Sequence, residues 1–150
     1  MMSNNNQHEV LSVVEAARRR IESLKKEAKS MVDDHWQYYL DENSSRTKFS
    51  EQSRLYSRVI DTKNGFAIEW HYIQQWYKNP QGKWKKDTRY LARGRSFRVA
   101  LNRYARDWEL QRLASFEDRA EMIRREVTLL TNLIESYDRL ARLRATKKAA

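Results

Sequence analysis

FAIEWHYIQQWYKNPQGKWKKDTRYLARGRSFRVALNRYARDW, which spans residues 66–108, concentrates the aromatic, basic and turn-forming residues of this chain. It contains ten Phe, Trp and Tyr residues, the only proline (Pro80) and two of the three glycines (Gly82 and Gly94). Ten lysines and arginines are opposed by three acidic residues, so the stretch carries +7 of the chain's formal net charge of +10. Outside it the sequence has one further glycine, Gly65, and no proline, which favours long helices on both sides. The sequence therefore predicts a basic, aromatic head between two helical arms.

Three strands are expected in the head, over residues 55–60, 66–77 and 84–91. Asn64-Gly65 separates the first two as a hairpin turn, because an Asn-Gly pair tolerates positive φ. Asn79 to Gly82 forms the second turn, with Pro and Gly at positions that turns favour. The result is a three-stranded antiparallel meander. Alternate residues of the second strand should share a face, with Phe66, Ile68, Trp70 and Tyr72 on one side and Ala67, Glu69, His71 and Ile73 on the other.

A short helix is expected after Gly94, with Ser96 as its N-cap. Apolar residues at helical spacing extend this pattern to Trp108, and Ser115 with Asp118 resembles a capping box that would follow a break. A small sheet needs aromatic rings to bury enough area. The expected core of the head contains Phe66, Trp70, Phe97, Leu101 and Trp108. Three rings near the second turn are expected to be exposed, namely Trp76, Tyr77 and Trp84.

The two arms, residues 9–42 and 109–147, each carry an apolar seam whose spacing alternates between three and four residues. Such a heptad seam keeps one stripe of a helix against a partner helix. In the N-terminal arm the seam includes Val14, Ile21 and Leu24, and in the C-terminal arm Ile123, Val127, Leu130 and Ile134. The arms have similar lengths, which predicts antiparallel pairing. This pairing can occur within one chain or across a homodimer, and the pattern alone does not decide between them.

The predicted fold is therefore α+β, in a single domain over residues 1–150. A small three-stranded antiparallel sheet and a short helix form the head, residues 54–108, between two long helices that pair as an antiparallel coiled coil. Residues 1–8 are polar and are expected to be disordered or frayed.

Catalysis is not expected from this sequence. The chain has no cysteine, and its three histidines lie far apart in sequence, so neither a thiolate site nor a histidine metal motif is present. Tyr38-Tyr39 could suggest a nucleophile for DNA strand transfer, but no histidine cluster accompanies the pair. We expect no cofactor and no metal. No apolar run approaches the roughly 18 residues of a membrane span, and the N-terminus has no signal region, so no membrane association is expected and the expected location is cytoplasmic.

The positive charge is the feature that indicates function. A sequence pI near 9.9 implies an acidic partner, and the charge is localised in the head. Arginine and lysine neutralise phosphates, and either a helix or a two-stranded ribbon fits the major groove of double-stranded DNA. The candidate nucleic-acid-binding residues are Lys85, Lys86, Arg89, Arg93, Arg95, Arg98, Asn102, Arg103 and Arg106.

Several short motifs resemble the MobI family of auxiliary mobilisation proteins of bacterial conjugative elements. They are Ile68-Glu69-Trp70, the segment from Arg89 to Arg95 around Gly94, Trp108-Glu109 and Ile123-Arg124, in that order. The similarity covers residues 36–133, roughly from the end of the N-terminal arm through most of the C-terminal arm. The resemblance implies a role in DNA transfer from a mobile genetic element. Members act at the origin of transfer beside a relaxase, which cuts the DNA.

Three functions stay open at this point. The first is a DNA-binding accessory protein of conjugation that recognises the origin of transfer and positions or recruits the relaxase, as a component of the relaxosome. The second is a small DNA- or RNA-binding regulator, for example of transcription. The third is a coiled-coil adaptor that binds proteins only.

Overall fold

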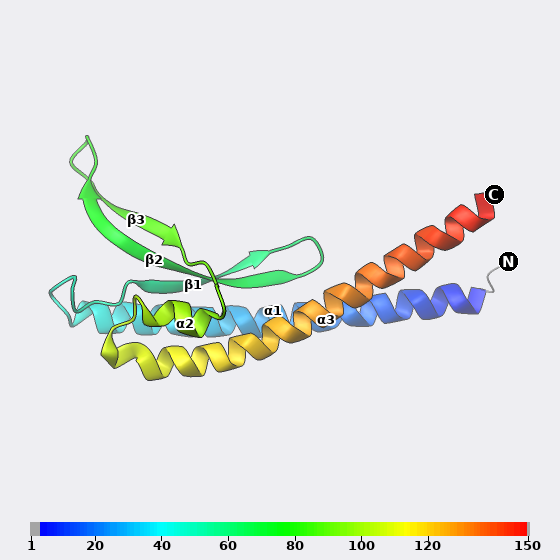
Figure 1. Cartoon of the computed structure of the whole chain (residues 1–150), viewed down its shortest axis with the longest axis horizontal. Coiled ribbons are helices and arrows are strands. Elements are labelled where there is room, and N and C mark those ends of the chain that lie inside the picture. Colours follow the sequence, from blue (N-terminus) through cyan, green and yellow to red (C-terminus); the bar gives the residue numbers. More distant parts are fainter. Residues whose placement is uncertain (1–3, 150) are drawn as a thin grey trace.

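The computed structural model describes residues 4–149, with side chains over residues 8–147. The elements follow in the order α1 (Asn4–Ser44), β1 (Leu55–Asp61), β2 (Phe66–Lys78), β3 (Trp84–Tyr90), α2 (Phe97–Asn102), the 3-10 helix η1 (Asp107–Glu109) and α3 (Leu110–Ala149). Figure 1 shows the two long helices side by side, with the sheet at one end of the pair and the β2–β3 hairpin projecting away from it. The predicted α+β class with a three-stranded antiparallel sheet is confirmed.

The long helices α1 and α3 pack antiparallel within one chain (Figure 1). Arg20 forms an ion pair with Glu126 at 2.6 Å, and Arg119 forms one with Glu27 at 3.0 Å, so earlier residues of α1 lie beside later residues of α3. Residues of both predicted seams enter one apolar cluster. The coiled-coil geometry of this pair stays a prediction, as does a homodimer. None of the helices within residues 4–149 is both long and apolar enough to cross a bilayer.

The helix ends differ from the predicted ones in two places. α1 already begins at Asn4, so the expected fraying is wrong for residues 4–8; residues 1–3 lie outside the described part. Polar residues without Gly or Pro do not stop a helix. α3 continues through Ser115, and the break lies earlier, at η1. There the Glu109 carboxylate accepts a hydrogen bond from the Arg106 backbone N–H at 3.1 Å and caps the turn.

The short helix α2 begins as predicted and ends sooner. The Ser96 hydroxyl accepts a hydrogen bond from the Val99 backbone N–H, which confirms the N-cap. The helix ends at Asn102, so Trp108 lies outside it and is only half-buried, not part of the core. Its indole N–H donates to the Glu51 carbonyl at 3.0 Å, and the Arg46 guanidinium lies 3.9 Å from the ring centroid. Trp108 therefore holds the α1–β1 loop.

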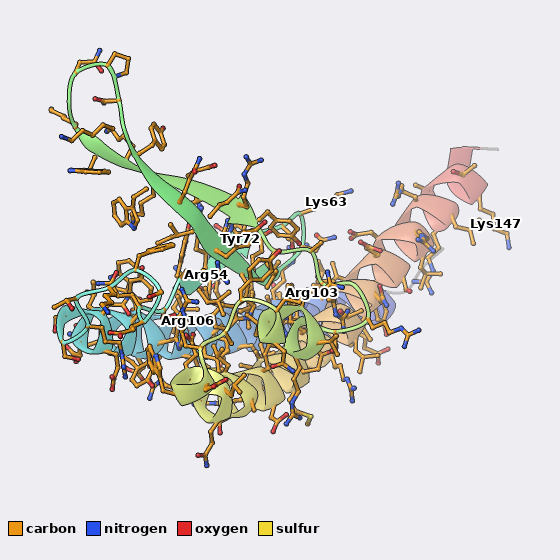
Figure 2. All side chains as sticks on the ribbon, turned by 60° about the vertical axis from the view of Figure 1, so that its left-hand side comes forward. Arg54, Lys63, Tyr72, Arg103, Arg106 and Lys147 are labelled. Carbon is orange, nitrogen blue, oxygen red and sulfur yellow. The ribbon has the colours of Figure 1, made fainter. Side chains whose placement is uncertain are left out.

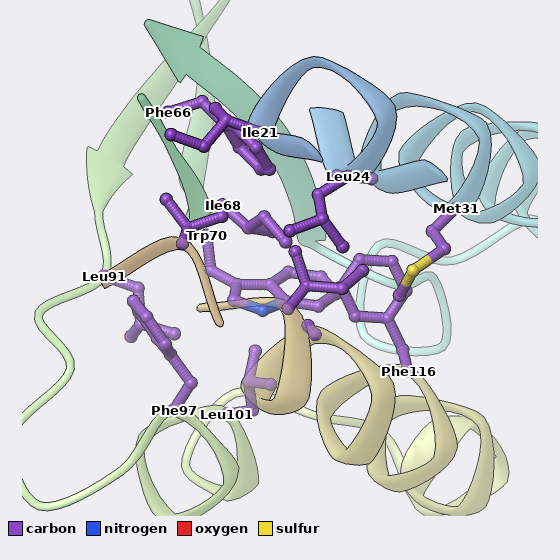
Figure 3. Packing of buried hydrophobic residues seen from close by; sticks show 14 of the residues in the cluster. Ile21, Leu24, Met31, Phe66, Ile68, Trp70, Leu91, Phe97, Leu101 and Phe116 are labelled. Carbon is purple, nitrogen blue, oxygen red and sulfur yellow. The ribbon is translucent and has the colours of Figure 1, made fainter. Parts of the chain in front are cut away.

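The core lies where α1 and α3 meet the root of the sheet, by which we mean β1 and the residues 66–72 of β2 that pair with it. Figure 3 shows the indole of Trp70 at its centre, packed among side chains from several elements. The predicted core residues Phe66, Trp70, Phe97 and Leu101 are all buried. Other members come from α1 (Ile21, Leu24, Met31), from the segment after β3 (Leu91) and from α3 (Phe116).

A buried polar network crosses this core. The Trp70 indole N–H donates to the Glu117 carboxylate, which is 3% exposed, and Glu117 also pairs with the Arg124 guanidinium at 2.6 Å. Arg124 donates further to the Ile68 carbonyl at 3.0 Å and lies 4.4 Å from the centroid of the Phe97 ring. A buried charge is tolerated when it is paired and hydrogen-bonded. The network therefore fixes β2 and α2 against α3.

The two hairpin turns use glycine for different reasons. Gly82 has φ of 77°, in the left-handed region that favours glycine. Gly65 does not have positive φ, so the predicted reason for its position is wrong. A Cβ atom at Gly65 would lie 3.0 Å from Cγ2 of Thr131 and 3.1 Å from Cγ1 of Val127. Gly65 is therefore required by the close approach of the β1–β2 turn to α3.

The sheet changes character along β2. β2 pairs with β1 through residues 66–72 and with β3 through residues 71–78. Beyond Tyr72 the sheet therefore has only two strands, those of the β2–β3 hairpin. One face of the root packs on the helices through Ile68 and Trp70. The predicted alternation holds as far as Ile73. A register shift between Ile73 and Gln75 then inserts one extra residue into β2, as a β-bulge does.

Candidate nucleic-acid interface

The nine predicted residues lie on three successive parts of the chain. Lys85, Lys86 and Arg89 belong to β3, and the others follow it. Arg93 and Arg95 flank Gly94, whose φ of 57° makes the tight bend between β3 and α2. The remaining four lie on α2 or just after it, namely Arg98, Asn102, Arg103 and Arg106. The structure thus places one group on the projecting hairpin and another around α2.

Three of the predicted arginines form ion pairs on the surface. Arg93 contacts Glu121 at 2.6 Å and Arg98 contacts Asp118 at 3.3 Å, so both reach acidic residues of α3, while Arg89 contacts Asp87 of its own strand at 3.3 Å. Each of these arginine side chains is more than half exposed. Exposed pairs contribute little to stability, about 0–1 kcal/mol. The same guanidinium groups can therefore exchange a carboxylate for a phosphate.

Arg106 has a structural position. Its side chain donates to the carbonyl oxygens of Gln52 at 2.9 Å and of Phe49 at 3.0 Å, which lie in the α1–β1 loop. Partial burial lowers the pKa of Arg106, and the nearby charge of Arg54 acts in the same direction. The side chain is half-buried, and its Nε and Nη2 atoms donate these two hydrogen bonds. Its main role in this geometry is to hold the loop.

Four predicted basic residues carry exposed charge without an ion pair among the described residues. They are Lys85, Lys86, Arg95 and Arg103. Asn102 is also exposed and lies one residue before Arg103. Unpaired, solvated charges are the ones that a polyanion can engage without first breaking a contact within the protein. These residues form the strongest part of the predicted site.

A basic and aromatic corner that sequence reasoning missed lies at the root of the hairpin. Tyr72 and Tyr104 stack with ring centroids 4.1 Å apart, and the neighbouring Tyr104 hydroxyl raises the pKa of Tyr72. Arg54 lies over the Tyr104 ring, 5.3 Å from its centroid, and donates to the Tyr104 carbonyl. Arg89 is opposite Tyr72 in the β2–β3 register. Figure 2 shows Arg54, Tyr72 and Arg103 in this region, whereas Lys147 lies far out on α3. No sequence motif marks Arg54, because its position depends on the loop that precedes β1.

The tip of the hairpin exposes the rings that were expected to be exposed. Trp76 is 43%, Tyr77 45% and Trp84 63% exposed. Lysines accompany two of these rings, since the Nζ of Lys78 lies 5.3 Å from the Trp84 centroid and that of Lys86 lies 5.7 Å from the Trp76 centroid. Cations at such distances over aromatic faces are weakly attracted to them.

The chain was compared with known protein families, curated proteins and solved structures. The family described as MobI protein matches residues 24–138, which is more than half of the chain. No curated protein and no solved structure matches the chain.

Proposed function

Because the chain belongs to the MobI family, we propose that it is a DNA-binding accessory protein of conjugative transfer that recognises an origin of transfer and positions or recruits the relaxase. The observation that carries the proposal is the unpaired, exposed charge of the head. Arg95 and Arg103 lie at the two ends of α2, and Lys85 lies on β3. These side chains would contact the phosphates of double-stranded DNA.

An exposed apolar stripe on α3 is the feature that favours a protein partner. Met122, Leu129 and Leu133 of α3 are exposed apolar side chains spaced seven and four residues apart, so they lie along one stripe of the helix. Stripes of this kind serve as interfaces with other proteins. In the proposed complex the head holds DNA and this stripe of α3 contacts the relaxase.

The proposal assigns no chemical step to this chain. Tyr38 is the tyrosine that was considered as a nucleophile. The Arg112 guanidinium lies 4.0 Å from the centroid of the Tyr38 ring, and the ring also packs against Trp108. Burial raises the pKa of Tyr38, which opposes formation of a phenolate. Incubation of supercoiled origin DNA with the purified protein and Mg²⁺ or Mn²⁺ should leave the DNA intact. Nicking that is lost in Tyr38→Phe would contradict the non-enzymatic proposal.

The test of DNA binding is fluorescence anisotropy with duplex DNA from the element's origin and with a scrambled duplex of equal length. Arg95→Glu/Arg103→Glu should weaken binding to the origin duplex by tenfold or more and should reduce the dependence of affinity on salt. The matched control is Arg18→Glu/Arg19→Glu, which makes the same change in net charge at two exposed positions of α1. Equal losses in the two variants would mean that only net charge matters and would contradict a site in the head.

Transfer itself is tested by mating. Deletion of the gene should abolish or strongly reduce transfer of the element, and the α1 control variant should restore it while the head variant does not. Purified relaxase should bind the wild-type protein and lose affinity for Met122→Lys/Leu129→Lys, with Leu11→Lys, at an exposed apolar position of α1, as the control. Normal transfer in the deletion strain would point to a regulator or an adaptor outside conjugation.

A further inference from the structure

The β-bulge in β2 decides which side chains meet at the hairpin tip. Before the bulge His71 is opposite Tyr90, and after it Trp76 is opposite Lys86 and Lys78 is opposite Trp84. Strict alternation would place Trp76 on the same face as Trp70 and Tyr72. The extra residue moves Trp76 to the other face, which it shares with Trp84 and Lys86, because residues directly opposite in a ladder point to the same side.

This face, which we call the tip face, is defined by Trp76, Lys78, Trp84 and Lys86. Each tryptophan is directly opposite a lysine, whose ammonium lies near the tryptophan ring. The distance from Nζ to the ring centroid is 5.3 Å for Lys78 and Trp84 and 5.7 Å for Lys86 and Trp76. The acidic residue of β3, Asp87, alternates onto the opposite face. The tip face therefore combines aromatic surface with positive charge only.

Packing does not account for these rings. Neither Trp76 nor Trp84 belongs to the apolar core, and within the described residues neither indole N–H has a protein acceptor. By contrast Trp70 and Trp108 both donate their N–H within the protein. Exposed tryptophans arranged with lysines are typical of a surface that binds a ligand.

We propose that the tip face binds single-stranded DNA, with unpaired bases stacked on Trp76 and Trp84 and with Lys78 and Lys86 contacting the adjacent phosphates. Stacking on aromatic rings beside basic side chains is how proteins hold single strands without reading their sequence. This inference rests on the proposed DNA-binding function and specifies the form of DNA that the hairpin takes, while the basic residues around α2 hold the duplex.

The exposed ring faces favour an unpaired strand over a duplex. Trp76 and Trp84 are diagonal neighbours across the ladder, at backbone positions about 7–8 Å apart. Bases within a strand of duplex DNA are stacked on one another about 3.4 Å apart, so neighbouring bases cover their faces. Unpaired bases expose their faces and can stack on aromatic side chains.

The experiment measures binding of the full-length protein to a 12-nucleotide oligo-dT, to a duplex of equal length and to oligo-rU, by anisotropy and by quenching of tryptophan fluorescence. Trp76→Ala and Trp84→Ala should each weaken oligo-dT binding by about tenfold and leave duplex binding within twofold. Trp84→Phe should retain most of the affinity, because a phenyl ring still stacks. Tyr77→Ala is the matched control, since Tyr77 is similarly exposed but alternates onto the opposite face.

The outcomes separate this inference from the proposed function. Oligo-dT binding that is unchanged in both tryptophan variants, or reduced equally in Tyr77→Ala, overturns the inference even if duplex binding is normal. Tighter binding of oligo-rU than of oligo-dT overturns the assignment to DNA. Loss of relaxase binding in the tryptophan variants with oligo-dT binding unchanged makes the tip face a protein interface and overturns it as well. A failure of the proposed duplex site appears instead as normal duplex binding by Arg95→Glu/Arg103→Glu.

Discussion

Trp70 and Trp84 lie on neighbouring strands of one hairpin and have opposite surroundings. At the root of the hairpin Trp70 is completely buried, with its indole N–H bonded to Glu117 and its ring edge-on to His35 at 5.2 Å. At the tip Trp84 is 63% exposed and contacts Lys78 of the facing strand. The residue type is the same in the two regions. What differs is whether α1 and α3 reach that part of the sheet.

The buried surroundings of Trp70 are shared by other residues of the family's motifs. Ile68, Trp70 and Arg124, which carry much of the resemblance, belong to the buried network at the root. Glu109 is buried too, and its carboxylate accepts hydrogen bonds from the Ser53 hydroxyl and from the Arg106 backbone. These positions hold the fold. The exposed tip lies outside the motifs, whereas Arg95, a proposed contact with duplex DNA, lies within the motif from Arg89 to Arg95.

The largest expected effect is at the root. Trp70→Ala should lower the free energy of unfolding by about 3–5 kcal/mol, because it leaves a cavity at the centre of the core. It also removes a donor from the buried Glu117 carboxylate. Urea unfolding followed by circular dichroism measures the change. A loss below about 1 kcal/mol would show that the root is not the region that stabilises this fold.

His35 gives the root a pH dependence. Its ring is 3% exposed, and neither ring nitrogen has a hydrogen-bond partner among the residues that the structure describes. Burial lowers its pKa from 6.5 to about 4, with a smaller contribution from the Arg112 charge. Between these values the unfolded chain binds a proton that the folded chain does not. The contribution of neutral His35 to the free energy of unfolding is therefore fully present above pH 6.5. This contribution falls by about 3 kcal/mol as the pH drops to 4.

The control for this prediction is His35→Leu, which removes the titrating group from the same packed site. The difference in unfolding free energy between His35→Leu and the wild type should grow in favour of the variant as the pH falls from 6.5 to 4. Carboxylates affect both proteins alike and cancel in the difference. A constant difference across this range would refute the buried neutral histidine.

The two turns sharpen the comparison further. Gly65→Ala should lower the free energy of unfolding by about 1–3 kcal/mol, because the new methyl group presses on α3. Gly82→Ala should lower it by about 1–2 kcal/mol through its positive φ, with open space around it. Thr131→Ser removes the methyl group nearest to Gly65 and should recover part of the first loss and none of the second. Equal recovery in both backgrounds would mean that the turn at the root does not depend on contact with α3.

The smallest expected effect is at the tip. Trp84→Ala should change the free energy of unfolding by less than about 0.5 kcal/mol, since substitutions at exposed positions without special contacts are usually near neutral. The same urea titration used for Trp70→Ala gives the value. A loss comparable with that of Trp70→Ala would mean that the tip is packed in solution, and the two regions would no longer differ.

Local patterns predicted the elements, and contacts distant in sequence set the details. The Pro80–Gly82 turn, the strands and the Ser96 cap each depend on a few neighbouring residues, and all three were predicted. The bulge after Ile73 has no such local signal. The position of Arg54 depends on a loop held by Trp108 and Arg106, and that of Glu117 on the approach of β2 to α3, so neither could be predicted from spacing.

The candidate site was predictable in composition and less so in geometry. The positive charge of Lys85, Lys86, Arg95 and Arg103 is exposed, as their density in the sequence indicated. The pairing of Arg93 and Arg98 with α3 and the anchoring role of Arg106 depend on tertiary contacts. Sequence alone indicates the sign of the surface charge, while the structure shows which charged side chains already form contacts within the protein.

The single inserted residue of β2 also bears on how this protein could diverge. Deletion of Gln74 would remove the bulge and restore strict alternation along the strand. Trp76 would still be opposite Lys86, and Lys78 would still be opposite Trp84, so the tip face would keep its residues. The loss of one codon at this place would therefore leave the recognition surface intact. Within such a lineage, specificity would change through substitutions on the tip face, and the length of the strand could change by this residue without altering it.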